Sequence, residues 1–286
     1  MSDFLPTYTL LPPGDVTPSH TAVVLHGIWG SRRNWQSYMR RMCERHPDWR
    51  FVLVDLRNHG DAPPAPAPHT LSACADDIAR LMDHLEMRPD VIMGHSFGGK
   101  VAMAFGDQYP DGTDAIWVLD ALPGARVGVE AADQGEAVRL IENLRAVPLP
   151  LESREALVEA LSARGFSQMI AQWMTTNLVR GQHDGAQGFV WRFNIDGIEA
   201  MLADYFQHDY WPFLEARAAG FPGPEIKLLR AARSDRWTPE IIARFEEIAS
   251  EHVSVHLLPD AGHWVHVDNP EGLAILLTEW FDAVGH

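Results

Sequence analysis

The chain of 286 residues carries 23 lysines and arginines against 39 aspartates and glutamates, a formal net charge of −16 at pH 7. Because this field repels a phosphate backbone, the composition argues against nucleic acid as a partner. The two cysteines supply neither a disulfide framework nor a metal-ligand pattern, and the sequence shows no secretory signal and no membrane-spanning apolar run, so we expect a cytoplasmic protein that does not bind membranes.

Short apolar strands alternate with amphipathic helices in the first part of the chain. Strands are predicted at 21–27, 50–56, 90–94 and 114–120, and helices at 33–45, 71–87 and 97–110. Near-continuous apolar strands separated by helices are typical of a parallel sheet that is covered on both faces. The first 121 residues therefore predict an α/β architecture.

This alternation is interrupted in the middle of the chain and then resumes. Helical stretches such as 136–147 and 154–174 occur in the middle without convincing strands. Strands at 225–231 and 252–259 and helices at 238–250 and 269–284 follow. The sequence predicts one α/β core, formed by residues 1–121 and 223–286, with a helical cap at 122–222 inserted into it.

The run Gly94-His95-Ser96-Phe97-Gly98 lies between a predicted strand and a predicted helix. Gly-x-Ser-x-Gly at this junction is the sequence of a nucleophile elbow, a strained turn that exposes the serine hydroxyl above the sheet. The N-terminus of the following helix favours a developing negative charge. Ser96 is therefore the candidate nucleophile.

A serine hydroxyl is a weak nucleophile and needs a base, which in turn needs a carboxylate to orient it. His263 follows the last predicted strand and is the candidate base, whereas we expect His266 to pack or to cap. Asp120 ends the strand at 114–120, and Asp235 follows the strand at 225–231. Either carboxylate keeps the chain order Ser, Asp, His.

An oxyanion needs two hydrogen-bond donors, and two segments can supply them. One is the N–H of Phe97, directly after the candidate nucleophile. The other is expected in the loop HGIWG at 26–30, where Ile28 is the first choice and Trp29 the second. Trp29 and Phe97 are also expected to form walls of the substrate pocket.

With these segments in order, the chain resembles the α/β-hydrolase superfamily, and within it the YbfF-type esterases and their ABHD-type relatives. The residues that carry the resemblance are HGIWGSRRNW (26–35), DLRNHGDAP (55–63), GHSFGGKVAM (94–103), VLDALPG (118–124), WRFN (191–194) and DAGHWVHVDNP (260–270). The resemblance implies a doubly wound, mostly parallel sheet of about eight strands, with a helical cap inserted after the sixth.

The resemblance also implies roles for individual residues. These relatives often carry a serine where this chain has Asp235, and they use an aspartate that matches Asp120. Since this chain has Asp235 as most of the superfamily does, we favour Asp235 as the triad acid. The loop of Arg57, Asn58 and His59 is expected to support the site, and Asn194 is expected to anchor the cap.

These observations predict a serine hydrolase that cleaves carboxylic esters through an acyl-enzyme on Ser96, with no metal and no cofactor. The large apolar side chains of the cap favour short-to-medium apolar acyl groups. Thioester, lactone or carbon–carbon bond hydrolysis and cofactor-free haloperoxidase chemistry stay open on the same fold, as does a non-catalytic ligand receptor. The expected partner is a small-molecule ester, and the expected state is a monomer or a homodimer.

Overall fold

A seven-stranded sheet forms the centre of the protein in the computed structural model, which describes residues 4–12, 18–126 and 135–284. The strand order is β1-β3-β2-β4-β5-β8-β9. The strands are β1 (Tyr8–Leu11), β2 (His20–Leu25), β3 (Trp49–Val54), β4 (Val91–His95), β5 (Ala115–Leu119), β8 (Glu225–Ala231) and β9 (Val253–Leu258). Only β1 is antiparallel to its neighbour, β3; the other pairings in this sheet are parallel.

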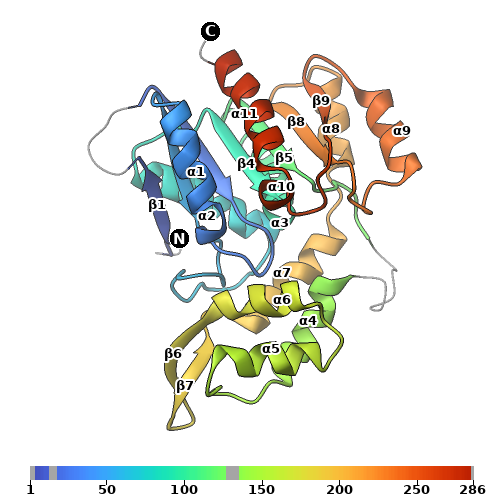
Figure 1. The fold of residues 1–286 in the computed structure, drawn as a ribbon. Coiled ribbons are helices and arrows are strands. Elements are labelled where there is room, and N and C mark those ends of the chain that lie inside the picture. Colours follow the sequence, from blue (N-terminus) through green and yellow to red (C-terminus); the bar gives the residue numbers. More distant parts are fainter. Residues whose placement is uncertain (1–3, 13–17, 127–134, 285–286) are drawn as a thin grey trace.

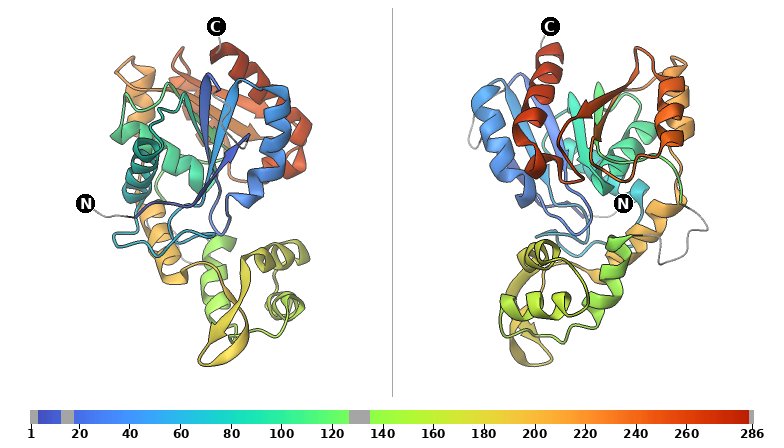
Figure 2. Two further views of the ribbon diagram at one scale, coloured as in Figure 1. Left: turned by 90° about the vertical axis from the view of Figure 1, so that its left-hand side faces the viewer. Right: turned by 45° about the vertical axis from the view of Figure 1, so that its right-hand side comes forward.

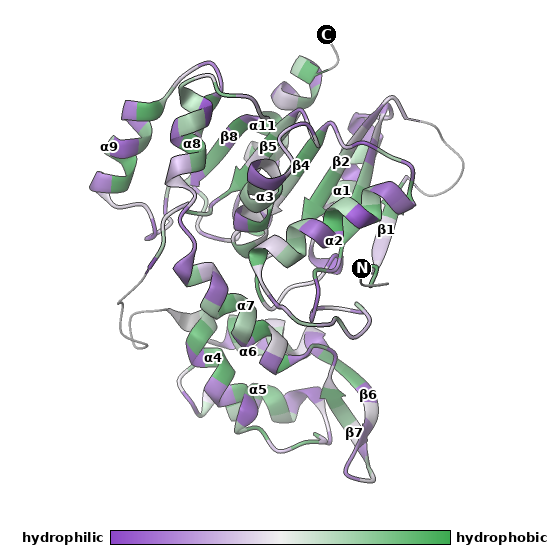
Figure 3. Ribbon diagram, turned by 180° about the vertical axis from the view of Figure 1, so that it is seen from behind, coloured by the Kyte–Doolittle hydropathy of each residue, from purple (hydrophilic) through white to green (hydrophobic). Residues whose placement is uncertain are grey.

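Helices cover both faces of this sheet (Figures 1 and 2). One face packs against α1 (Arg33–Arg45), α10 (Val265–Asp268) and α11 (Pro270–Val284), and the other against α2 (Leu71–His84), α3 (Phe97–Gln108), α8 (Trp211–Ala218) and α9 (Pro239–Ile248). Successive strand residues point to opposite faces, so that Val23 and Leu25 join one core cluster and Ala22 and Val24 the other. Figure 3 shows the resulting band of hydrophobic residues along the central strands.

The segment between β5 and β8 forms a lobe beside the sheet (Figure 1). It contains α4 (Glu136–Arg145), α5 (Arg154–Ser162), α6 (Gln168–Met174), the 3-10 turn Thr175–Asn177, β6 (Leu178–His183), β7 (Ala186–Trp191) and α7 (Ile195–Gln207). A separate hydrophobic cluster that includes Leu144, Leu157 and Ile198 forms the interior of this lobe. The helix α8, which also falls in the 122–222 range, packs instead against the sheet.

The expectation of an insertion without strands is wrong, because β6 and β7 form an antiparallel hairpin there. Asp184 and Gly185 connect the two strands with φ of +48° and +83°. Asp-Gly is a preferred dipeptide for such two-residue turns, so the sequence did contain a hairpin signal. Apart from the buried Leu178, the residues of these strands are half-buried or exposed and form no buried apolar run, and for that reason the apolar pattern did not reveal them.

The strand count and the point of insertion also differ from the expectation. In the described residues the sheet has seven strands, where about eight were expected, and the insertion follows β5, the fifth of these strands in chain order. The short edge strand β1 has four residues, three of them only partly buried, which explains why no apolar run marked it. Among the described residues, no helix is long and apolar enough to cross a membrane.

Candidate active site

Ser96 occupies the sharp turn between β4 and α3. Its φ of +53° and ψ of −116° place it in a region that non-glycine residues rarely adopt. The strand β4 ends at His95 and the helix begins at Phe97, so this single residue reverses the chain direction. The Ser96 N–H donates to Leu119 O at 3.0 Å, which ties the strained turn to the end of β5.

The glycines two positions away from Ser96 are required by close backbone contacts. A Cβ on Gly94 would lie 2.0 Å from the carbonyl oxygen of Gly98, and a Cβ on Gly98 would lie 2.6 Å from that of His26. These neighbours are main-chain atoms, which cannot move aside as a flexible side chain can. The elbow therefore forms because the sequence leaves no side chain at either position.

A hydrogen bond of 2.7 Å joins His263 Nδ1 to Asp120 Oδ2. The Asp120 side chain is fully buried, and its carboxylate also accepts hydrogen bonds from Ser234 Oγ at 2.8 Å, Trp237 Nε1 at 2.8 Å and the Ala231 N–H at 3.1 Å. With four donors around it, the carboxylate has one fixed orientation. His263 Nδ1 must then carry the proton, which leaves Nε2 available as a base.

The pKa shifts agree with this proton assignment. Burial alone would raise the pKa of Asp120, but the contact with His263 and the donors from Ser234 and Ala231 hold it below its usual value. Burial lowers the pKa of His263, and the hydrogen bond to Asp120 offsets only part of that effect. At neutral pH the pair is a carboxylate and a neutral imidazole.

The preference for Asp235 as the partner of His263 is corrected by this geometry. Asp235 is exposed, lines the pocket and makes no hydrogen bond to His263 in the described part of the chain. Its neighbours Ser234 and Trp237 instead donate to Asp120. The loop after β8 therefore supplies donors to the buried carboxylate that follows β5, while the exposed carboxylate of Asp235 is not the one bonded to the imidazole.

The loop after β2 contains Ile28 and Trp29, the two residues expected as alternatives for the second oxyanion donor. The Trp29 N–H donates to His59 Nε2 at 3.2 Å and is therefore occupied. Ile28 lines the pocket, and no hydrogen bond of its N–H is found to any described residue. The Phe97 N–H is the first of α3 and has no partner within the helix. The geometry thus favours Ile28 over Trp29 as the second donor.

Two buried histidines support this loop. His26 accepts from the Leu56 N–H at 3.1 Å and donates to Gly27 O at 2.7 Å, and His59 donates to Arg57 O at 2.9 Å while accepting from Trp29. Burial lowers the pKa of His26 to about 4 and the pKa of His59 to about 3, so both rings stay neutral. His59 was expected to support the site, whereas the contacts of His26 were not expected from the sequence.

The neighbouring histidines are structural. His95 Nε2 lies 2.7 Å from His263 O, which fixes the backbone that carries the candidate base. His266 stacks on Trp35 with 4.2 Å between ring centroids, and burial lowers its pKa to about 4. The expectation that His266 packs rather than reacts agrees with this stacking.

Several contacts hold the inserted segment against the core. Asn194 caps α7 by accepting from the Asp196 and Gly197 N–H groups, and its own N–H donates to Asn58 O at 3.0 Å. Trp29 Nε1 donates to Ala137 O at 3.1 Å. Asn194 thus joins the core and the insertion in the way that the sequence analysis expected of a cap anchor.

Lys100 makes a further connection from inside the structure. The side chain is fully buried on α3, and its ammonium group donates to the backbone oxygens of Gly124, Tyr205 and His208 at 2.8–2.9 Å. It also lies 4.3 Å from the centre of the Tyr205 ring. Burial lowers the pKa of this lysine to about 8. One core residue therefore holds both chain segments that connect the insertion to the core.

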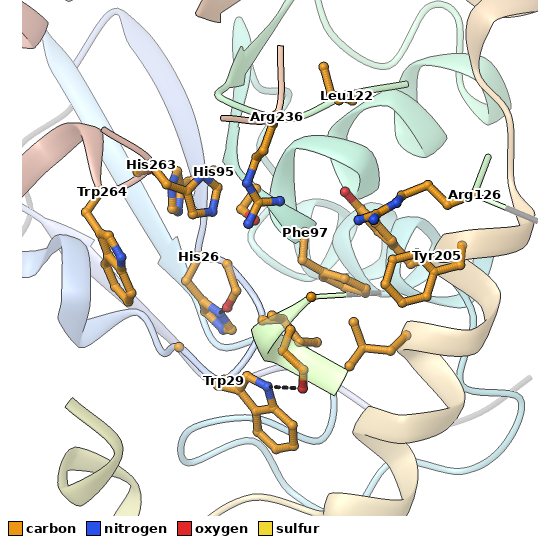
Figure 4. A pocket seen from close by; sticks show the side chains of 18 of the residues that line it. His26, Trp29, His95, Phe97, Leu122, Arg126, Tyr205, Arg236, His263 and Trp264 are labelled. Atoms are coloured by element: carbon orange, nitrogen blue, oxygen red, sulfur yellow. Dashed lines mark hydrogen bonds between the residues drawn. The ribbon is translucent and has the colours of Figure 1, made fainter. Parts of the chain in front are cut away.

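A cavity of about 720 Å³ contains these groups (Figure 4). Ser96, His263, Ile28 and Phe97 all line it, so the structure brings the candidate nucleophile, base and oxyanion donors to one pocket. Trp29 also lines it, in agreement with its expected place in the wall. Within the described ranges, no group of three or more His, Cys, Asp or Glu side chains is arranged to hold a metal ion.

Comparisons with known proteins show the family and the fold of this chain. The model of the alpha/beta hydrolase family matches residues 22–275. The sn-1-specific diacylglycerol lipase ABHD11 of Mus musculus is 30% identical over 279 residues, which are 96% of this chain and 84% of that protein. The esterase YbfF of Escherichia coli is 24% identical over 257 residues, 88% of this chain and 89% of that protein.

A solved structure described as a marine microorganism esterase superimposes with a TM-score of 0.77. It is 24% identical in sequence, and the match covers 97% of this chain and 99% of that one. This similarity shows the fold. Together with the family match, it confirms both the expected α/β architecture and the resemblance that the sequence motifs suggested.

Proposed function

The chain belongs to the alpha/beta hydrolase family, and from that premise we propose that it is a serine esterase acting on carboxylic esters with apolar acyl groups. The observation that carries the proposal is the 2.7 Å hydrogen bond between His263 and the buried Asp120, in the same pocket as Ser96. A neutral imidazole oriented by a buried carboxylate is the arrangement that activates a serine.

In the proposed reaction, Ser96 attacks the ester carbonyl while His263 Nε2 takes the hydroxyl proton. Asp120 keeps the proton on Nδ1 and stabilises the imidazolium that forms. The Ile28 and Phe97 N–H groups donate to the oxyanion, a contribution of roughly 10²–10³ in rate for each donor. His263 then protonates the leaving alkoxide and later activates the water that releases the acid.

The side chains around the pocket support an apolar acyl group. Trp29, Ile170, Trp173 and Trp264 all line it. Trp173 and Trp264 meet edge to face with 4.6 Å between centroids. Aromatic walls of this kind bind alkyl chains by excluding water. The names of the mouse and Escherichia coli relatives, a lipase and an esterase, point in the same direction.

The proposal is tested by labelling with a fluorophosphonate probe and mapping the adduct by mass spectrometry. We expect a single adduct on Ser96, together with hydrolysis of 4-nitrophenyl butyrate that Ser96→Ala abolishes. The matched control is Ser72→Ala, at an exposed serine of α2 outside the pocket. This variant should be labelled by the probe and should hydrolyse the ester like the unmodified protein. Absence of both labelling and turnover in the folded protein would refute the proposal.

A further inference from the structure

Two arginines bring positive charge to the pocket. Arg236 and Arg126 both line it, in a protein whose formal net charge is −16. Figure 4 shows the Arg236 side chain pointing into the pocket, and Arg126 beside Tyr205 on the side away from Trp264. An acidic protein that turns two guanidinium groups toward its candidate active site has a local field opposite to its average one.

Among the residues that the structure describes, Arg236 is bound to no carboxylate. Its guanidinium makes no hydrogen bond or ion pair with any residue in the described part of the chain. By contrast, Arg32 and Arg33, near the start of α1, bind Asp61, and Arg57 binds the buried Asp77. A guanidinium that is directed into a pocket and left unpaired has five donors available for a ligand.

The charge of Arg236 acts on the groups that surround the nucleophile. It lowers the pKa of His95, His263 and Tyr205, which line the same pocket. Asp235 also acts on His263 and opposes this effect. Asp120 is bonded to His263, whereas Asp235 lines the pocket together with Arg236 and Arg126.

Arg126 has a different setting and a supporting position. The Arg126 guanidinium lies 5.6 Å from the centre of the Phe206 ring, and the backbone N–H of Arg126 donates to Phe206 O at 2.7 Å. These contacts fix the residue to α7, beside Tyr205. The positive charge of Arg126 therefore adds to that of Arg236 at the pocket, from a different segment of the chain.

Two of the tryptophans that favour an apolar acyl chain lie elsewhere in the pocket. Trp29 and Trp264 are on the sides away from Arg126 in Figure 4. We propose that Arg236, assisted by Arg126, binds an anionic group on the leaving-group side of the ester, so that the preferred substrate joins an apolar acyl chain to an alcohol that carries a carboxylate or a phosphate. This inference rests on the proposed esterase function and specifies its substrate class.

The test compares two butyrate esters that differ only in charge. The anionic probe is 3-carboxy-4-nitrophenyl butyrate, and the neutral probe is its carboxamide, 3-carbamoyl-4-nitrophenyl butyrate. We expect kcat/KM for the anionic ester to exceed that for the neutral one at low salt, and the ratio to fall as salt screens the attraction. Arg236→Met should reduce this ratio about tenfold, since a charge-assisted hydrogen bond is lost.

Arg88→Met removes the same charge from an exposed position outside the pocket and should leave the ratio unchanged.

A third ester, mono-(4-nitrophenyl) succinate, carries its carboxylate on the acyl side. Preference for this ester over the first anionic one would overturn the placement of the anion site. A 3-phosphonooxy-4-nitrophenyl ester of butyrate compares phosphate with carboxylate, and a higher kcat/KM for either over the carboxamide supports the proposal.

The two possible failures are distinguishable. If the neutral ester is hydrolysed at Ser96 but charge has no effect on kcat/KM, the anion site is refuted and the esterase function stands. If no ester is hydrolysed and the fluorophosphonate does not label Ser96, the esterase function itself fails. A ratio that falls equally in Arg236→Met and Arg88→Met would show that net charge, and not this pocket, causes the preference.

Discussion

Asp120→Asn is the substitution that most directly tests the arrangement of the site. The carboxylate of Asp120 accepts four hydrogen bonds, two at each oxygen. Oδ1 accepts from the Ala231 N–H and from Trp237 Nε1, and Oδ2 accepts from Ser234 Oγ and His263 Nδ1. An asparagine has the same shape but only one oxygen, so the question is which position that oxygen takes.

The donors around Asp120 decide the orientation of the amide. A backbone N–H and an indole N–H can only donate, so the asparagine oxygen must occupy the Oδ1 position, facing Ala231 and Trp237. The amide NH₂ then faces Ser234 and His263. The serine hydroxyl can rotate and accept, but His263 can accept only if its proton moves from Nδ1 to Nε2. In that tautomer Nε2 cannot take the proton of Ser96.

The expected loss follows from this reversal of the tautomer. In serine hydrolases, a wrong tautomer of the base lowers kcat by about 10⁴, which corresponds to ~5.5 kcal/mol of transition-state stabilisation. Asp235→Asn should lower kcat only severalfold, because Asp235 is exposed and makes no hydrogen bond to His263 in the described part of the chain. Both variants conserve the shape of the side chain, which makes them a matched pair.

The assay is the hydrolysis of 4-nitrophenyl butyrate by each purified variant, with thermal unfolding to show that the variants are folded. The structure predicts that Asp120→Asn loses at least about a hundred times more activity than Asp235→Asn. A larger loss in Asp235→Asn would mean that the contact between His263 and Asp120 is not the one used in catalysis, and it would refute the reasoning above.

The remaining predictions concern pH, the elbow and the buried lysine. Because burial lowers the pKa of His263, kcat/KM should rise with pH, reach half its maximum below pH 6.5 and stay level at neutral pH. A midpoint above pH 6.5 would contradict the assignment of His263 as the base. Gly94→Ala places a Cβ 2.0 Å from the Gly98 carbonyl, so it should destabilise the fold by at least about 3 kcal/mol in urea unfolding, or prevent folding. Lys100→Met leaves three backbone oxygens without their donor but also removes a buried charge, so it should lower the free energy of unfolding by about 2 kcal/mol. The control is Lys227→Met, at the chain's other lysine, which should lower the free energy of unfolding by less than about 1 kcal/mol. Equal unfolding midpoints for the two lysine variants would show that the buried contacts do not stabilise the fold.

The strands that lie inside the sheet could be predicted from their composition. β2, β3, β4 and β5 are runs of buried apolar residues flanked by amphipathic helices, and such runs have few alternatives to a covered parallel sheet. The edge strand β1 and the hairpin of β6 and β7 were missed because half-exposed strands carry no continuous apolar run. Their signals, a four-residue edge and an Asp-Gly turn, are too short to stand out in an apolar pattern.

The sequence by itself determined the sharp turn at Ser96 and the position of His263 after the last strand, because each depends on a local pattern with a steric or chemical reason. It also predicted an oxyanion donor in the loop after β2. The partner of His263 depended on the tertiary structure. Asp120 and Asp235 both follow strands that end at the same edge of the sheet, and no local pattern separates them. Only the packing of Trp237 and Ser234 around Asp120 decides which carboxylate is buried and oriented toward the imidazole, because that choice depends on contacts between residues more than a hundred positions apart.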